Sequence, residues 1–275
     1  MSEIPNREKN ECGVQVKNLP LPVNFDADSC RLFFGPGVVC KETSGISSAQ
    51  MRGVLRVHDY NREEPFYRFY AGVCLQEDEA QLKKHHLRYD LIVVYAGTAG
   101  GEYKKTSGHY HSISAAANGM PVSYPEIYEV LQGHAVFVLQ SCGTDGEITD
   151  VAAVQAAPGD KLIIPPGYGH ATVNVGREPL VFADLVSDLC KNTYGQIAQN
   201  HGMCCYVLKE EGGFALAPNP NYAQAPQARV CCVQEYPRLG TARSIPLYQT
   251  AARHPEWFDY LNHPEKYMDV FMRLS

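Results

Sequence analysis

Two histidines, His109 and His111, stand one residue apart in the stretch TSGHYHSISAAANGMPVSYPEIYEVLQG. Alternate side chains of a β-strand point to one face, so these two imidazoles would lie together. Glu126 and Tyr128 would share a face for the same reason, and His170 follows a Pro-Pro-Gly turn further along. Three ring nitrogens and one carboxylate suit a divalent first-row metal with positions left open for water or substrate. The sequence therefore predicts a metal site, provided that three strands of a small barrel bring these residues together.

Short apolar or alternating runs that could form such strands fill the chain from Glu64 to Leu208. They include PFYRFYAGVCL, YDLIVVYAG, EIYEVLQG, HAVFVLQ, KLIIPPG, HATVNVG and LVFADLV. Strands about ten residues apart, separated by Gly, Pro, Asn and Asp, are typical of an antiparallel sandwich or barrel. The pair Asp145-Gly146 predicts a hairpin within this region. We therefore expect an all-β fold.

The two ends of the chain differ from this central region. Residues 1–47 are expected to form an N-terminal arm, and SSAQMRGVL indicates a short helical or irregular start to a barrel of residues 48–216 that holds the metal site. The remaining residues, 217–275, begin with the linker-like APNPNYAQAPQAR. In the tail, Pro255 and Pro264 each suit the first position of a short helix, with Glu in the first turn. We expect two short helices that pack on the barrel or on a partner.

The composition excludes several classes of partner. The chain has 275 residues, of which 45% are hydrophobic and 20% charged, and its net charge of −6 argues against nucleic acid or an anionic membrane surface. The start, MSEIPNREKNECGVQ, has charges where a signal peptide needs an apolar core, and the chain has no apolar window of about eighteen residues. The ten cysteines have no CxxC spacing and are expected to be reduced thiols. We expect a cytoplasmic protein that binds neither nucleic acid nor membrane.

The segment APGDKLIIPPGYGHATVN resembles the second motif of the cupin superfamily, G(x)5PxG(x)2H(x)3N. The matching residues are Gly159, Pro165, Gly167, His170 and Asn174. The first cupin motif is similar to the His-x-His pair followed by E(x)6G, although residues 112–125 replace its short spacer. More narrowly, residues 48–222 resemble the cupin-type phosphoglucose isomerases of archaea and some bacteria. This resemblance is carried by YKKTSGHYH, EIYEVLQGHAVFVLQ, PPGYGHATVNVGREPLVF and TYGQIAQNHGM.

The resemblance implies a fold, an activity and a cofactor. The fold would be a double-stranded β-helix, or jelly-roll barrel, with an N-terminal arm and short C-terminal helices. The activity would be glucose-6-phosphate isomerase, a metal-dependent aldose-ketose interconversion in glycolysis and gluconeogenesis, carried out by a homodimer on a sugar phosphate. The expected cofactor is one divalent ion per chain, Fe²⁺ ahead of Mn²⁺ or Zn²⁺. Its ligands would be His109, His111, Glu126 and His170.

The resemblance also assigns the substrate contacts. Thr106, Gly108 and Tyr67 would bind the phosphate, while Glu126 would move the proton and Tyr128 would lie next to the sugar. A proton-transfer route through a cis-enediol and a metal-assisted hydride shift both remain open.

Two departures from the family concern substrate choice, because Ile92 replaces a phosphate-binding threonine and the loop of residues 112–125 is long. The basic residues Lys104 and Lys105, beside the phosphate block, are expected to be solvated. Two kinds of alternative function stay open. The first is another metal cupin enzyme, either a different phosphosugar isomerase or a dioxygenase. The second is a non-catalytic module that binds a sugar phosphate.

Overall fold

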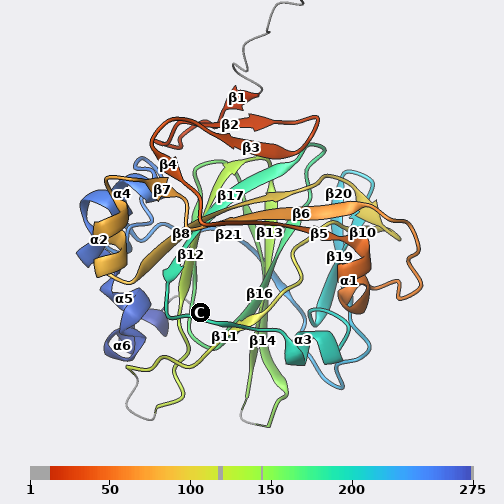
Figure 1. The fold of residues 1–275 in the computed structure, drawn as a ribbon. Helices are drawn as coiled ribbons and strands as arrows, with labels where there is room; N and C mark the ends of the chain where they lie inside the picture. Colours follow the sequence, from red (N-terminus) through yellow and green to blue (C-terminus); the bar gives the residue numbers. More distant parts are fainter. Residues whose placement is uncertain (1–12, 117–119, 144, 274–275) are drawn as a thin grey trace, which may run out of the picture.

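Strands form most of the secondary structure in residues 13–116, 120–143 and 145–273, which are the residues that the computed structural model describes. Two sheets face each other and form a barrel (Figure 1). The larger sheet has the strand order β15 (Lys161–Ile164), β12 (Glu126–Gln132), β17 (Leu180–Ser187), β8 (Leu87–Val94), β6 (Pro65–Ala71) and β5 (Glu42–Ser47). The second sheet has the order β16 (Tyr168–Asn174), β13 (Ala135–Cys142), β14 (Ile148–Ala156) and β21 (Arg229–Cys232). The expected all-β barrel is confirmed.

Smaller elements surround the barrel. A four-stranded sheet consists of β20 (Gly213–Pro218), β19 (Cys205–Glu210), β10 (Glu102–Tyr103) and β9 (Thr98–Ala99), and a three-stranded sheet of β1 (Val14–Gln15), β2 (Val23–Asp26) and β3 (Arg31–Phe34). Two strand pairs are β11 (Tyr110–His111) with β18 (Asn192–Thr193), and β4 (Val38–Val39) with β7 (Cys74–Leu75). The α-helices are α1 (Ser48–Met51), α2 (Glu79–Lys84), α3 (Gly195–Gln199), α4 (Leu247–Arg253), α5 (Asp259–Asn262) and α6 (Met268–Phe271). Turns of 3-10 helix span Arg52–Val54, Pro237–Leu239, Pro255–Phe258 and Pro264–Tyr267.

Strand β12 is buried on both of its faces. Tyr128 and Val130 point into the barrel, where they pack in one cluster with Phe137 of the facing sheet. Ile127 and Leu131 belong to a separate cluster on the outer side of the sheet. A strand buried on both faces needs apolar side chains on both, and EIYEVLQ supplies Tyr128 and Val130 on one face and Ile127 and Leu131 on the other.

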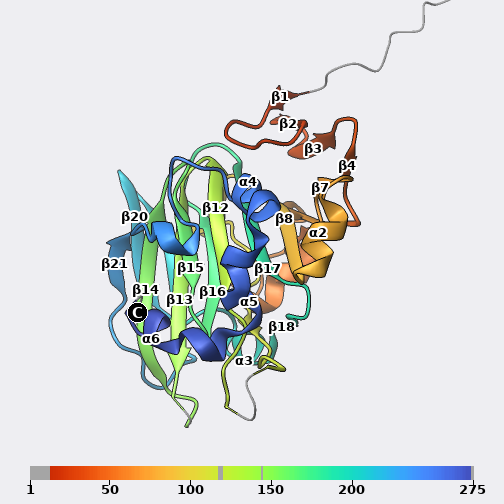
Figure 2. The ribbon, with the colours of Figure 1, turned by 90° about the vertical axis from the view of Figure 1, so that its left-hand side faces the viewer.

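The C-terminal tail covers the outer face of the larger sheet (Figure 2). Leu247, Phe258 and Leu261 pack in the same buried cluster as Ile127. The backbone N–H of Leu247 also donates to Oε2 of Glu129 on β12, at 2.9 Å. Of the two positions expected for the tail, the structure therefore shows packing on its own barrel.

The two short helices expected after prolines are present in this tail. Pro255 begins a 3-10 turn that continues into α5, and Pro264 begins another that continues into α6. Proline suits this position because the first N–H groups of a helix have no partner within the helix. Helix α4 is a third short helix, which the sequence analysis did not predict.

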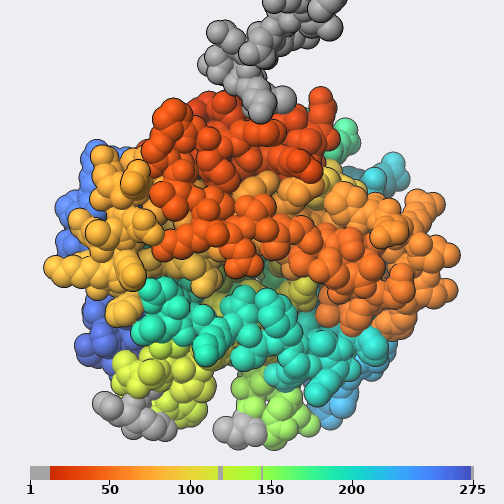
Figure 3. All heavy atoms as spheres, in the orientation of Figure 1, coloured from red at the N-terminus to blue at the C-terminus, as the bar shows by residue number. Residues whose placement is uncertain are grey.

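The outer segments of the chain also contribute to the barrel sheets. Strand β5 lies within residues 1–47 and forms one edge of the larger sheet, while β21 lies within residues 217–275 and pairs in parallel with β14. The division of the chain at residues 47 and 216 stays a prediction. Figure 3 shows the segment of β18 and α3, coloured teal, lying across the front of the barrel below β5 and β6.

Two further expectations concern the thiols and the membrane. All nine cysteines in the described part of the chain are free, as expected. Within the same residues, every helix is too short or too polar to cross a bilayer.

Candidate metal centre and substrate cavity

The four residues expected to bind a metal lie together, and their ligand atoms are all within 4.8 Å of one another. Glu126 begins β12, His111 ends β11, and His170 lies on β16. His109 precedes β11 and forms an antiparallel bridge with His170, with backbone N···O distances of 3.1 and 3.0 Å. The strand alternation proposed from the sequence therefore brings both histidines of the pair to one site.

Backbone carbonyls orient the imidazole rings. Nδ1 of His111 lies 2.8 Å from the carbonyl oxygen of Tyr124, and Nδ1 of His170 lies 3.4 Å from that of Tyr168. A ring that donates from Nδ1 keeps the lone pair on Nε2, which is the atom facing the other ligands. These carbonyls therefore hold the rings in the form that a metal requires.

Two buried polar atoms at the centre of the cluster lack a hydrogen-bond partner among the described residues. Oε2 of Glu126 and Nε2 of His170 are 3.1 Å apart, but in the described residues neither buried atom makes a hydrogen bond of normal geometry. Nε2 of His109 faces Nε2 of His111 at 3.2 Å. Buried polar groups are normally hydrogen-bonded, so this arrangement needs a partner that accepts several lone pairs. A divalent cation meets that need, and the residues therefore fit the expected metal.

The protonation of the cluster also fits a cation. Burial lowers the pKa of His109 well below its usual value, and it lowers the pKa of His111 to about 4. Burial alone would raise the pKa of Glu126, but contact with His170 and the charges of the surrounding histidines lower it to about 2. At neutral pH the cluster therefore combines a carboxylate with the neutral imidazoles of His109 and His111, as metal binding requires.

A cavity of about 180 Å³ lies beside the cluster, and it holds most of the expected substrate contacts. Five residues singled out in the sequence line it: Tyr67, Thr106, His109, Glu126 and Tyr128. Ile92 lines it too, at the position where the family has a threonine. Asn192 and Tyr194 reach it from the segment across the front of the barrel.

The expected phosphate contacts have distinct environments. The hydroxyl of Thr106 accepts a hydrogen bond from the N–H of Thr172 at 3.0 Å, so its own proton stays available to an anion. The hydroxyl of Tyr67 lies 3.0 Å from Oγ of Ser107, which also lines the cavity. Ser107 was not predicted as a contact, although it stands between two expected contacts in TSG.

Gly108 is not among the lining residues and has a structural reason to be glycine. Its φ is +77°, and a Cβ there would lie 3.1 Å from Sδ of Met203. Its contact with phosphate stays a prediction.

The expectation that the two adjacent lysines are solvated is wrong. Lys104 is 5% exposed and its Nζ lies 2.8 Å from Oε2 of Glu64, while Lys105 is 3% exposed and its Nζ lies 2.6 Å from Oε1 of Glu102. Both lysines are held by carboxylates, Glu64 before β6 and Glu102 on β10, and neither lysine lines the cavity. A buried ammonium group requires such a partner because an unpaired charge in the interior is very costly.

The long loop of residues 112–125 supports the metal ligand rather than the cavity. Its described residues do not line the cavity. The loop folds back so that the N–H of Tyr124 donates to the carbonyl of Ser112 at 3.1 Å, and the carbonyl of Tyr124 then meets the ring of His111. The extra residues thus position a carbonyl behind one imidazole.

Three charged residues in the cavity wall were missed by the sequence analysis. Arg88 and Asp90 lie on β8, and Asp184 lies on β17 directly opposite Asp90. Their only sequence signal is a charge inside an otherwise apolar run, as in YDLIVVYAG and LVFADLV.

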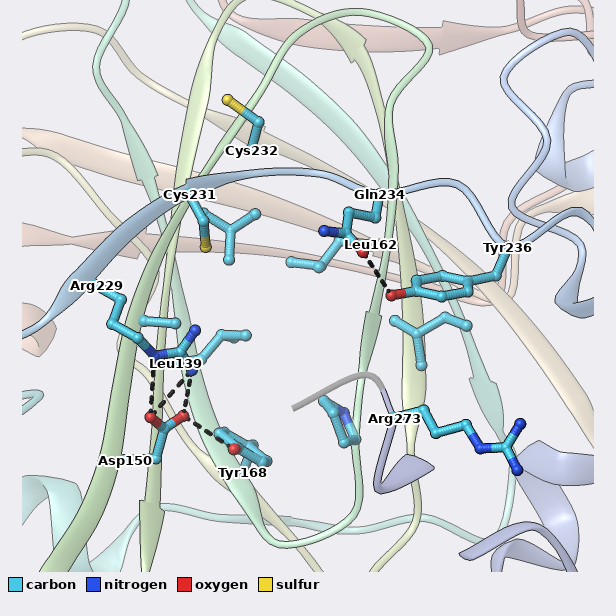
Figure 4. A pocket seen from close by; sticks show the side chains of 14 residues that line it. Leu139, Asp150, Leu162, Tyr168, Arg229, Cys231, Cys232, Gln234, Tyr236 and Arg273 are labelled. Atoms are coloured by element: carbon cyan, nitrogen blue, oxygen red, sulfur yellow. Dashed lines mark hydrogen bonds and ion pairs between the residues drawn. The ribbon is translucent and has the colours of Figure 1, made fainter. Parts of the chain in front are cut away.

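A second and larger pocket, of about 270 Å³, is lined by residues of β13, β14, β15 and β21 (Figure 4). Five of its polar side chains bond with one another in two groups. Arg229 reaches both carboxylate oxygens of Asp150, whose Oδ2 also accepts from the hydroxyl of Tyr168 at 3.0 Å. The hydroxyl of Tyr236 donates to Gln234 at 3.0 Å. The candidate metal ligands do not line this pocket.

Comparisons with known proteins cover the same part of the chain. The family model described as Glucose-6-phosphate isomerase (GPI) matches residues 48–224, which include all four candidate ligands. A glucose-6-phosphate isomerase of Thermococcus litoralis is 30% identical over 153 residues, covering 56% of this chain and 72% of that protein. One of Pyrococcus furiosus is 29% identical over 195 residues, covering 68% of this chain and 96% of that protein. A solved oxalate decarboxylase of Bacillus subtilis aligns with a TM-score of 0.31 and 22% identity, covering 46% of this chain and 27% of that chain.

Proposed function

The chain belongs to the archaeal-type cupin family of glucose-6-phosphate isomerases, and we propose how its residues interconvert glucose 6-phosphate and fructose 6-phosphate. The observation that carries this proposal is the cluster of three histidines and one glutamate beside the substrate-sized cavity. An open-chain sugar phosphate would place its carbonyl at the Glu126 side of this cavity and its phosphate at Thr106 and Tyr67.

We assign one divalent ion to the ligands His109, His111, Glu126 and His170, Fe²⁺ ahead of Mn²⁺ or Zn²⁺. Three imidazoles and a carboxylate suit borderline first-row metals. When bound, the ion supplies a Lewis acid that polarises the sugar carbonyl.

Glu126 would move the proton between C2 and C1. It is ionised and borders the cavity, so it combines the charge and the position of a base. Tyr128 follows on the same face of β12, where burial and the charge of Glu126 raise the pKa of its hydroxyl far above the usual value. It would therefore stay protonated and hydrogen-bond a sugar oxygen.

The phosphate would lie against Thr106 and Tyr67, with Gly108 as the third expected contact. Both hydroxyls line the cavity, and Ser107 links to Tyr67 there. Hydroxyl donors hold a phosphate without a full positive charge, which fits the engagement of Lys104 and Lys105 elsewhere.

The proposal also includes a homodimer in the cytoplasm, with a sugar phosphate as the small-molecule partner and neither nucleic acid nor membrane. The free thiols of the described cysteines support a reducing compartment. Sedimentation velocity would measure the oligomeric state.

A coupled assay for fructose 6-phosphate conversion, before and after chelation, tests the function. We expect activity in the metal-loaded protein, its loss on chelation and its return on addition of Fe²⁺ or Mn²⁺. Full turnover in metal-free protein would contradict the metal assignment. Oxygen uptake with a candidate substrate, in the absence of isomerisation, would point to a dioxygenase instead.

A further inference from the structure

The cavity wall contains a buried carboxyl group that the proposed reaction does not use. Asp184 is 3% exposed and lines the cavity, and among the described residues none bonds its Oδ1. A buried polar atom without a partner destabilises a fold. A ligand in the cavity would relieve this penalty.

The neighbours of Asp184 are already engaged. Asp90 accepts from the N–H of Gly72 at 2.8 Å, and its Oδ2 lies 2.8 Å from Nε of Arg88. Because Arg88 neutralises Asp90 and stands in the same wall, a second metal ion is a poor match for this corner. A neutral group with hydroxyls fits better.

The strand register places Asp184 relative to the rest of the site. Asp184 on β17 pairs with Tyr128 on β12 and with Asp90 on β8. The next inward-facing residue of β17 is Val186, which pairs with Glu126. Tyr67 pairs with Val94, which is two inward-facing positions beyond Asp90 on β8. Asp184 is thus closer along the sheet to the proton-moving Glu126 than to the phosphate contact.

We propose that Asp184 is a specificity-determining residue that hydrogen-bonds the C3 hydroxyl of the sugar chain, next to the reacting carbons. This inference rests on the proposed function, since it takes C1 and C2 at Glu126 and the phosphate at Tyr67. A sugar hydroxyl entering the cavity loses water and needs a protein partner, which Oδ1 supplies.

The protonation of the group supports the same role. Burial raises the pKa of Asp184 well above its usual value, and the charges of Asp90 and Glu126 raise it further. A neutral carboxyl group that hydrogen-bonds Asp90 leaves Oδ1 to accept from a sugar hydroxyl, and it does not repel an anionic sugar phosphate.

The test combines variants of the protein with deoxy substrates. Asp184→Ala should lower kcat/KM for glucose 6-phosphate about 10-fold, and Asp184→Asn should stay within about 3-fold of the wild type because an amide keeps a donor and an acceptor. With 3-deoxyglucose 6-phosphate, the wild type and Asp184→Ala should be equal, since the bonded hydroxyl is gone. With the 4-deoxy analogue, the difference should persist.

Several outcomes would overturn the assignment. One is an equal fold-loss of kcat/KM in Asp184→Ala on all three substrates. A second is a loss that disappears with the 4-deoxy analogue instead of the 3-deoxy analogue. A third is a kcat/KM of Asp184→Asn as low as that of Asp184→Ala. The matched control is Asp188→Ala, at the exposed Asp188 that pairs with His86 at 3.0 Å outside the cavity, and it should behave as the wild type.

Calorimetric binding of glucose 6-phosphate, its 3-deoxy analogue and inorganic phosphate to the same metal-loaded proteins separates this inference from the proposed function. If the wild type binds but does not isomerise, the function fails. Weaker binding of glucose 6-phosphate alone by Asp184→Ala would still support the hydroxyl contact, and unchanged binding of all three ligands would refute it.

Discussion

The pocket beside β21 is larger than the cavity at the metal cluster, about 270 Å³ against 180 Å³, yet none of its lining side chains keeps a buried polar atom without a hydrogen bond among the described residues. Arg229, Asp150 and Tyr168 form a closed set of hydrogen bonds there (Figure 4). In the smaller cavity and the cluster beside it, Glu126 and Asp184 each keep a buried oxygen without a hydrogen bond among the described residues. Unsatisfied buried groups, rather than volume, therefore mark where a ligand belongs.

The same contrast occurs within β12, between two glutamates three residues apart. Glu126 faces the metal cluster, while Glu129 faces outward, where its Oε1 lies 3.0 Å from Nζ of the fully buried Lys161. Glu129 also accepts from the N–H of Leu247 and so ties the tail to the barrel. Glu126 thus keeps an oxygen without a hydrogen bond among the described residues, whereas Glu129 stabilises the packing.

The largest expected effect tests the first of these glutamates. Glu126→Gln should lower kcat about 10³-fold or more, because it removes a base and a charged ligand, while the melting temperature should hardly change. Coupled kinetics and metal analysis measure the two losses. Near-normal turnover would remove Glu126 from the mechanism.

Glu129→Gln should have the opposite profile. It leaves Lys161 buried without a counter-charge, so the free energy of unfolding should fall by about 3 kcal/mol, while kcat of the folded protein should be retained. Urea denaturation measures the change. The control is Glu129→Gln with Lys161→Met, which should recover most of the loss; no recovery would mean that the ion pair is not the cause.

The metal-free protein should lose stability as the pH falls from about 6.5 toward 4. The folded-state pKa of His111 is lowered to about 4. Between pH 4 and 6.5 its imidazole is therefore protonated in the unfolded chain but not in the folded chain. One such proton corresponds to about 1.4 kcal/mol per pH unit. Glu126, with its pKa lowered to about 2, should extend the loss below pH 4.5. A flat stability profile between pH 4 and 6.5 in chelated protein would contradict this picture.

The smallest effect is expected in the second pocket. Arg229→Ala breaks an ion pair whose arginine is 54% exposed, so stability should change by less than about 1 kcal/mol and kcat/KM by less than about 2-fold. A much larger fall in kcat/KM would show that this pocket takes part in the reaction and would break the comparison between the two pockets.

Much of the metal centre could be predicted because its signals are local. Strand alternation pairs His109 with His111, and motif spacing points to Glu126 and His170. Thr106 and Tyr67 came from the family resemblance instead, and both line the cavity, although their contact with phosphate stays a prediction. Ser107 was not predicted to line the cavity, because a single serine outside a helix or strand has no characteristic sequence pattern.

The charged wall could not be predicted, because its residues meet only through pairing between strands. Asp90 and Asp184 are far apart in sequence and become neighbours through the register of β8 with β17. A single charge within an apolar run does not reveal which strand will lie opposite. The burial of Lys104 depends in the same way on Glu64, which is far away in sequence, whereas the partner of Lys105 is the nearby Glu102.

By itself, the sequence determined the all-β fold, the four ligands and the two proline-initiated turns of the tail, since periodicity, motif spacing and the missing N–H of proline act within a few residues. Only the tertiary structure decided that Tyr124 supports His111, that the tail packs on its own barrel, and that Asp184 is left without a bond for its Oδ1. These features depend on which distant groups share a buried space and on which of them remain unpaired.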